Sequence, residues 1–177
     1  FHPVTMEDNT AQIQCEALLK ALESVMDKYK LLFTLPNSDT DGRVIISLIN
    51  NFVSLHPNKS LAITSLGKER YYAALKHASA VIGNSSSGLV EAPSFHIPTL
   101  NIGNRQKGRT RGDSVVDCEA SYESVSKSLH YALSSEMKCK VKNASNPYFK
   151  PGTLNAIFEV VAQYPLNTLV YKSFYNI

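Results

Sequence analysis

The sequence has few of the residues that cross-link a chain or anchor it in a membrane. Tryptophan is absent, and there are only three cysteines, Cys15, Cys118 and Cys139. These cysteines are odd in number, far apart and without a CxxC pair, which is typical of reduced thiols and argues against a disulfide scaffold or a structural zinc site. No apolar run approaches the roughly 18 residues that a membrane-spanning helix needs. We therefore expect a cytoplasmic protein with no membrane partner and no bound metal.

Neither positive nor negative charges are concentrated in any one segment of the sequence. The 18 Lys and Arg residues exceed the 15 Asp and Glu residues by three, and no long basic run occurs. Neither a nucleic-acid partner nor a membrane-surface helix is indicated. The length of 177 residues, 44% of them hydrophobic, suits one domain with its own core. Because the chain starts at Phe1 with no strand or helix cap before His2, we expect a domain over residues 1–177 that is a piece of a longer polypeptide.

Short apolar runs alternate with amphipathic segments along the chain. We expect strands at Lys30–Leu35, Ser60–Ser65, Ser79–Gly83, Pro98–Ile102 and Ser114–Cys118. We expect helices between Asp8 and Met26 and over Arg43–Leu55, Lys68–His77, Leu89–Phe95, Tyr122–Leu133 and Gly152–Gln163. Strands that are apolar on both sides are typical of a parallel sheet covered by helices on both faces. The fold class predicted is α/β, a Rossmann-like three-layer domain.

In such folds ligands bind beyond the carboxyl ends of the strands. The loop Gly83–Gly88 leaves one of the expected strands and consists of small and hydroxyl residues. Its backbone amides and hydroxyls suit a phosphate, although the serines would also serve simply to cap the next helix. The loop is neither a Walker A sequence nor GxGxxG, which disfavours ATP bound by a P-loop and NAD bound by the usual fingerprint.

Three charged or titratable residues near this edge are further candidates. Glu91 follows the serine loop, where a carboxylate could accept two hydrogen bonds from a ribose diol or could be an ordinary solvated acid. Arg105 belongs to a loop with three other cations and is closest to the strand end, so it could pair with a diphosphate; a charge run of this kind is otherwise a solvated loop. His2 could donate to a phosphate or transfer a proton, or be purely structural.

Residues 1–5, 35–42 and above all 83–109 (Gly-Asn-Ser-Ser-Ser-Gly-Leu-Val-Glu through Gly-Asn-Arg-Gln-Lys-Gly-Arg) resemble the hydrolysing UDP-N-acetylglucosamine 2-epimerases. The resemblance implies the C-terminal half of a two-domain fold shared with nucleotide-sugar glycosyltransferases, with the N-terminal domain missing. It also implies a UDP-sugar substrate, no cofactor, a homo-oligomer in the full-length protein, and production of N-acetylmannosamine or a related amino sugar for sialic-acid-type biosynthesis.

Matched position by position, the resemblance implies a role for eight residues. In this interpretation His2 lies near the diphosphate and Asn37 contacts the nucleotide. Ser65 or Leu66 contacts uracil through its backbone, and Ser85 and Ser86 hold the phosphates. Glu91 binds the ribose, and Arg105 binds the diphosphate. His2 and Arg105 are the candidates for a part in catalysis. The His2-Pro3 pair and the Asn-Ser-Ser-Ser run at 84–87 depart from the non-hydrolysing relatives and favour hydrolysis.

Three other functions remain open from the sequence: a sugar transferase with the same two-domain fold, a non-hydrolysing epimerase, and a non-catalytic nucleotide-sugar-binding module. In the resembled family, the acidic residues that handle the sugar C2 proton belong to the first domain. The chain alone is therefore expected to bind nucleotide without turnover.

Overall fold

The computed structural model describes residues 1–4, 10–37 and 41–165. By their contacts these residues divide between a larger unit, Phe1–Pro147, and a smaller one that starts at Tyr148. Each unit is described by itself below.

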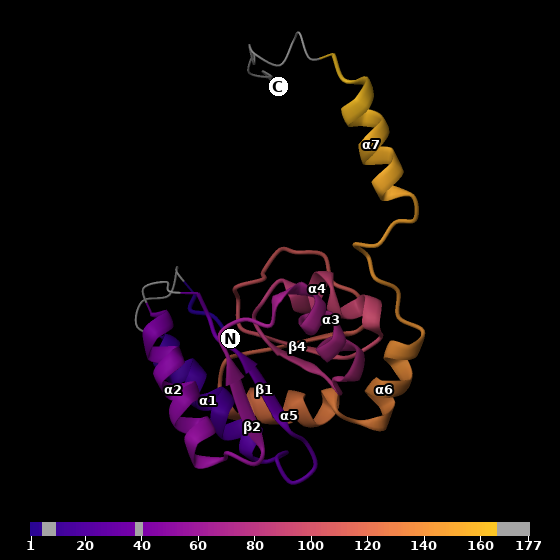
Figure 1. The fold of residues 1–177 in the computed structure, drawn as a ribbon. Helices are drawn as coiled ribbons and strands as arrows, with labels where there is room; N and C mark the ends of the chain where they lie inside the picture. Colours follow the sequence, from indigo (N-terminus) through magenta and orange to yellow (C-terminus); the bar gives the residue numbers. More distant parts are fainter. Residues whose placement is uncertain (5–9, 38–40, 166–177) are drawn as a thin grey trace. The chain divides into compact units, whose positions relative to one another are not determined.

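The larger unit alternates strands and helices, as the sequence predicts (Figure 1). Its strands are β1 (Leu31–Thr34), β2 (Ser60–Ile63), β3 (Val81–Gly83), β4 (Thr99–Ile102) and β5 (Val115–Cys118). Its helices are α1 (Ala11–Glu23), α2 (Gly42–Leu55), α3 (Gly67–His77), α4 (Ser87–Val90), the 3-10 helix η1 (Ala92–Phe95), α5 (Tyr122–Ala132) and α6 (Ser135–Lys142).

All strand pairings are parallel, which confirms the predicted fold class. β1 pairs with β2 from Leu31 opposite Ser60 to Thr34 opposite Ile63. β3 pairs with β4, and β4 with β5. The strands form two hydrogen-bonded groups, β1-β2 and β3-β4-β5, because no ladder joins β1 to β3.

Helix α1 is central to the hydrophobic core of the larger unit. Its residues Leu18 and Leu22 pack with Leu100 and Ile102 of β4 and with Leu129 of α5. The adjacent part of the same helix face contributes Cys15 and Leu19 to a second cluster, which includes Ile45, Ile49 and Phe52 of α2. A smaller cluster joins α3, through Leu75, to Ala92 of η1 and to Ile97. The two strand groups are therefore tied together through helices rather than through a shared ladder.

Two helical segments differ from the sequence expectation. The expected helix Leu89–Phe95 starts earlier, at Ser87, and is interrupted at Glu91, where a single α turn gives way to a 3-10 turn. Helix α6 was not expected, because its charged sequence lacks an obvious apolar stripe. Its start is nevertheless marked by Ser134, whose hydroxyl accepts from Met137 N, and only Met137 and Val141 of the helix are buried.

The smaller unit contains helix α7 (Thr153–Gln163), close to the expected Gly152–Gln163. Large apolar side chains on this helix are exposed, including Leu154 and Phe158. Among the described residues, no helix is both long enough and apolar enough to span a membrane. The described residues also contain no group of three or more His, Cys, Asp or Glu side chains that could hold a metal ion.

Gly88 fixes how closely the serine loop approaches β4. A Cβ at Gly88 would lie 2.6 Å from Thr99 Cγ2, and the Thr99 hydroxyl donates to Gly88 O at 2.8 Å. We predict that Gly88→Ala lowers the free energy of unfolding by about 1–3 kcal/mol, the usual cost of overpacking. Thr99→Ser removes the methyl group in the way and keeps the hydroxyl, so the double variant Gly88→Ala/Thr99→Ser should recover most of the loss. Urea denaturation of the four proteins measures this, and additive losses would contradict the predicted clash.

Candidate nucleotide site

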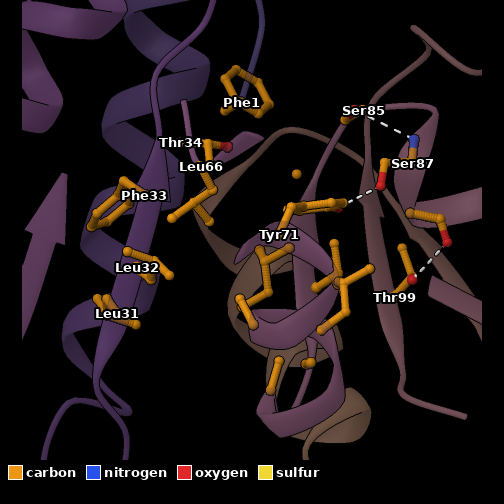
Figure 2. Close-up of a pocket in the computed structure, with 18 of the residues that line it drawn as sticks. Phe1, Leu31, Leu32, Phe33, Thr34, Leu66, Tyr71, Ser85, Ser87 and Thr99 are labelled. Atoms are coloured by element: carbon orange, nitrogen blue, oxygen red, sulfur yellow. Dashed lines mark hydrogen bonds between the residues drawn. The ribbon is translucent and has the colours of Figure 1, made fainter. Parts of the chain in front are cut away.

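A cavity of about 1120 Å³ opens where the loops leave β1, β2 and β3 (Figure 2). Six of the eight predicted site residues line it, namely His2, Asn37, Ser65, Leu66, Ser85 and Glu91. Ser86 and Arg105 do not line the cavity. Ser86 belongs to the serine loop beside it, and Arg105 is hydrogen-bonded to that loop. Residues from His2 to Arg105, far apart in the sequence, therefore meet at one edge of the strands.

Asn84 holds three parts of this edge together. Its side-chain amide exchanges two hydrogen bonds with the backbone of His2: His2 N donates to Asn84 Oδ1 at 2.8 Å, and Asn84 Nδ2 donates to His2 O at 2.7 Å. Its carbonyl oxygen accepts from Arg105 Nη1 at 3.1 Å and from Gln106 Nε2 at 2.9 Å. Asn84 is fully buried, and its bond with Gln106 forms away from competing water, whereas the bonds with His2 and Arg105 are partly buried.

The serine loop is tightened by its own hydrogen bonds. Gly88 N donates to Ser85 O at 3.2 Å, and Ser87 N donates to Ser85 Oγ at 3.4 Å. Ser86 occupies the N-cap position of α4 but makes no side-chain cap bond. The alternative that the serines only cap the next helix therefore fits Ser85 in part and does not fit Ser86. Since α4 is one turn long, its dipole can add little to anion binding, and the loop's hydroxyl and amide groups matter more.

Glu91 is part of a side-chain network rather than a solvated helix-face acid. Ser87 Oγ donates to Glu91 Oε2 at 2.5 Å, and Tyr72 OH donates to Glu91 Oε1 at 3.3 Å. Tyr71 OH is hydrogen-bonded to Ser87 Oγ (Figure 2). An ionised carboxylate has about four lone-pair sites, so Glu91 keeps capacity for a diol.

The two tyrosines are held in their protonated, donating form. Burial is the main cause that raises the pKa of Tyr71, with the Glu91 charge adding to it and the Ser87 bond opposing it. The negative charge of Glu91 is the main cause that raises the pKa of Tyr72. Both hydroxyls therefore remain donors at neutral pH.

Sequence reasoning missed Tyr71, Tyr72 and the distinct part played by Ser87. Ser87 lies four residues before Glu91, a helical spacing that could have indicated their contact. Tyr71 and Tyr72 lie on α3, 16 and 19 residues from their partners in the chain, and only the folded structure brings them to the serine loop.

The four cations of the loop after β4 are not equivalent. Arg105 reaches back to Asn84 O, beside the serine loop. Arg111 is paired with Asp117 at 2.8 Å and donates to the carbonyl oxygens of Arg109 and Gln106, so it stabilises the loop itself. Lys107 and Arg109 are exposed. Of the four, Arg105 is the one whose side chain contacts the serine loop within the described residues.

The loops after β1 and β2 are more exposed. Asn37 is exposed. Its carbonyl oxygen is so close to Gly42 that a Cβ added at Gly42 would be only 2.3 Å from it. Ser65 Oγ accepts from Gly67 N at 3.2 Å, which turns the backbone of Ser65 and Leu66 around the start of α3. These two loops present backbone groups beside the cavity.

The cysteines take no part in the hydrogen-bond network described above, although Cys15 lines the cavity. Cys15 is buried in the core, and burial raises the pKa of its thiol to about 11. Burial, helped by Asp117 and Glu119, raises the pKa of Cys118 to about 11 as well. Neither is a thiolate nucleophile at neutral pH. Of the three cysteines, Cys15 is buried, Cys118 is half-buried and Cys139 is exposed, so an interpretation of all three as core thiols is wrong for Cys139.

Comparison with known proteins places this arrangement in a family. The chain is 34% identical over 178 residues to the polysialic acid biosynthesis protein P7 of Escherichia coli, covering 100% of this chain and 45% of that protein. It is 38% identical over 119 residues to a GDP/UDP-N,N'-diacetylbacillosamine 2-epimerase (hydrolyzing) of Campylobacter jejuni, covering 67% of this chain and 31% of the relative. The structure is similar to the S. aureus MnaA-UDP co-structure, with a TM-score of 0.70 and 18% identity over 97% of this chain and 46% of that one.

The chain therefore spans less than half the length of these relatives. The family model for UDP-N-acetylglucosamine 2-epimerase matches residues 1–162, which is most of the sequence. Together with the parallel strands and the serine loop at their carboxyl edge, this match shows that the chain belongs to the UDP-N-acetylglucosamine 2-epimerase family.

Proposed function

We propose that this chain is the UDP-binding half of a hydrolysing 2-epimerase, which converts UDP-N-acetylglucosamine or a related UDP-sugar and water to UDP and a 2-epimeric amino sugar. The observation that carries the proposal is the joining, through Asn84, of His2, the serine loop and Arg105 around one polar cavity mouth. Relatives named as hydrolysing epimerases support the reaction type.

In this reaction UDP is eliminated across C1 and C2 of the sugar, and water then adds so that C2 is inverted. The C1–O bond electrons leave with the diphosphate, so negative charge grows on its oxygens. Preorganised donors aimed at that charge stabilise the transition state more than the ground state. Ser85, Ser86, His2 and Arg105 are the candidates for these donors, with Arg105 and His2 taking part in catalysis.

The remaining contacts would bind the nucleoside. Glu91, held by Ser87 and Tyr72, would accept from the two ribose hydroxyls. Asn37, Ser65 and Leu66 would contact the nucleotide from the loops after β1 and β2. The proposal includes an N-terminal domain that supplies the residues acting on the sugar C2 proton, a homo-oligomeric full-length protein, and a cytoplasmic location, for which the separated free cysteines are the support.

Calorimetric titration of the chain with UDP tests this proposal. We expect weak, saturable binding and no release of UDP from UDP-N-acetylglucosamine by the chain alone. The full-length parent should release UDP and free amino sugar together without an acceptor. UDP release that requires an acceptor would indicate a transferase, and nucleotide affinity without product in the parent would indicate a binding module. Absence of heat with UDP at millimolar concentration would refute the UDP site itself.

Glu91 provides a more specific prediction. Glu91→Ala should weaken UDP binding by about 1.5–3 kcal/mol, the range for hydrogen bonds to a charged group, or roughly 10- to 150-fold. The variant should bind UDP and 2′-deoxy-UDP equally, whereas the unaltered chain prefers UDP. Tyr72→Phe is the matched control, because it removes the 3.3 Å bond to Glu91 but keeps the carboxylate and should keep the preference. A Glu91→Ala chain that still prefers UDP as strongly would remove the residue from ribose recognition.

Arg105 should matter in turnover rather than in binding alone. In the full-length parent, Arg105→Lys keeps the charge but loses the planar two-point contact with the diphosphate. We expect kcat to fall by about tenfold or more, with a smaller change in KM, because the contact strengthens as the C1–O bond breaks.

Arg109→Lys is the control for this change, since Arg109 lies in the same loop and is exposed. Arg111 is unsuitable as a control because it is paired with Asp117. Steady-state kinetics of both variants decide the question. Equal effects at positions 105 and 109, or an effect at 105 confined to KM, would make Arg105 a general electrostatic attractor only.

A further inference from the structure

Gln106 differs from its neighbours in the loop after β4. In residues 103–112, all of which the structure describes, it is the one buried residue, with 3% of its surface exposed. Its side chain reaches back to the serine loop, where Gln106 Nε2 donates to Asn84 O at 2.9 Å. Its other amide atom, Oε1, is buried and has no partner among the described residues. Neither the proposed phosphate donors nor the proposed nucleoside contacts include Gln106.

Stability does not explain why an amide is buried at this position. A buried amide with an unpartnered oxygen costs free energy, whereas an apolar side chain of similar shape would not. The Gln106 side chain donates to a carbonyl that Arg105 also binds, at 3.1 Å, so Asn84 O would remain hydrogen-bonded without Gln106. The second donor at this carbonyl must therefore contribute something other than the pairing of a buried acceptor.

Gln106 is the more firmly held of the two donors. Arg105 is exposed, and in the proposed function its guanidinium binds the diphosphate. The backbone of Gln106 is instead fixed by the fold, because its carbonyl oxygen accepts from Arg109 N at 3.3 Å and from Arg111 Nη2 at 3.2 Å. Arg111 is in turn paired with Asp117 of β5. The Gln106 amide therefore stays in place relative to β5 when Arg105 binds a ligand.

The direction of the Asn84 carbonyl determines where the next N–H group points. The two bonds to the His2 backbone fix the side chain of Asn84, which leaves rotation about its Cα–C bond as the soft dihedral of this peptide. The described chain contains no cis peptide bond, so the C=O and N–H of the Asn84–Ser85 peptide point in opposite directions. With Asn84 O held toward Gln106, Ser85 N–H points away from the loop after β4.

The first amides of the serine loop are available to a ligand. Ser87 N donates to Ser85 Oγ (Figure 2), and Gly88 N donates to Ser85 O, so these two amides are used inside the loop. Ser85 N and Ser86 N have no acceptor in the described part of the chain. Ser85 is half-buried and lines the cavity. A backbone N–H that is fixed in direction and unpaired suits an anionic oxygen.

We propose that Gln106 is a positioning residue for the phosphates of UDP, because its bond to Asn84 O fixes the Asn84–Ser85 peptide so that Ser85 N–H donates to a phosphate oxygen. The inference rests on the proposed UDP site. Gln106 does not touch the ligand, and it keeps Asn84 O bonded when Arg105 binds the diphosphate. The phosphate part of the affinity, and not the nucleoside part, thus depends on a side chain that does not line the cavity.

Two-dimensional amide NMR titrations of the chain with UDP and with uridine test this role, because they measure weak affinities and report on the Ser85 amide in the same spectra. In the unaltered chain, UDP should bind more tightly than uridine and should move the Ser85 amide proton downfield. Gln106→Met keeps a side chain of similar shape but removes the donor. Its UDP affinity should fall by at least about fivefold, the effect of one hydrogen bond, and its uridine affinity should stay the same. The downfield shift of Ser85 with UDP should be largely lost.

Asn104→Met is the matched control. It introduces the same apolar side chain in place of an amide in the same loop, but Asn104 is exposed. Both affinities and the Ser85 shift should remain those of the unaltered chain. Gln106→Asn is a second variant, which keeps an amide but withdraws it by one methylene group from Asn84 O, so it should lose UDP affinity as Gln106→Met does. Urea denaturation of Gln106→Met should give a midpoint close to that of the unaltered chain.

The outcomes separate this inference from the function on which it rests. Unchanged UDP affinity and an unchanged Ser85 shift in both Gln106 variants would overturn the role of Gln106 and leave the UDP site in place. Equal losses of UDP and uridine affinity, or loss of the fold in both variants, would make Gln106 a structural residue only. The same loss in Asn104→Met would assign the effect to the loop as a whole. Failure of the unaltered chain to bind UDP would refute the proposed function and the inference with it.

Discussion

The side chain of Asn84 is the interaction on which the candidate site depends. A buried amide has two donors and a carbonyl acceptor, and here the side chain is matched to the backbone of His2, 82 residues away in sequence. The backbone carbonyl of the same residue holds Arg105 and Gln106. Loss of either set would leave buried polar groups unpaired, a cost of about 1–3 kcal/mol for each group. One residue thus fixes the relative positions of three loops that a phosphate ligand would need together.

Glu91 illustrates how the fold prepares a charged group before ligand arrives. A carboxylate free in solution would lose rotamer freedom when it bound a ribose. Ser87 and Tyr72 have already restricted Glu91, and Tyr71 in turn restricts Ser87. A tyrosine is ordinarily protonated at neutral pH, and the raised pKa values of Tyr71 and Tyr72 extend this donating form to higher pH. If Glu91 binds the ribose as proposed, part of the entropy cost of binding is met during folding.

Local sequence pattern was sufficient for most of the fold. The five expected strands all exist, each within two residues of its expected ends, because apolar runs bounded by turn residues are a local signal. Helix α6 was not predicted, because most of its residues are polar or charged and only Met137 and Val141 are buried. The separation of the strands into two groups was not predictable either, since ladder formation depends on contacts between distant segments.

For the site, the sequence predicted the loops better than the roles within them. The serine loop, Glu91 and Arg105 could be chosen because the carboxyl edge of a parallel sheet collects ligand-binding loops. The sequence distinguished Arg105 from Arg111 only by its nearness to the strand end, and it could not show that Arg111 is already paired. What separates them is the position of Asp117 on β5, which takes Arg111 out of the set available to a ligand. A charge becomes available to substrate only when the fold supplies no closer counter-charge, and that condition is set by tertiary structure. The specificity of such a loop therefore depends on the anions placed near its other cations as much as on the cation that faces the ligand.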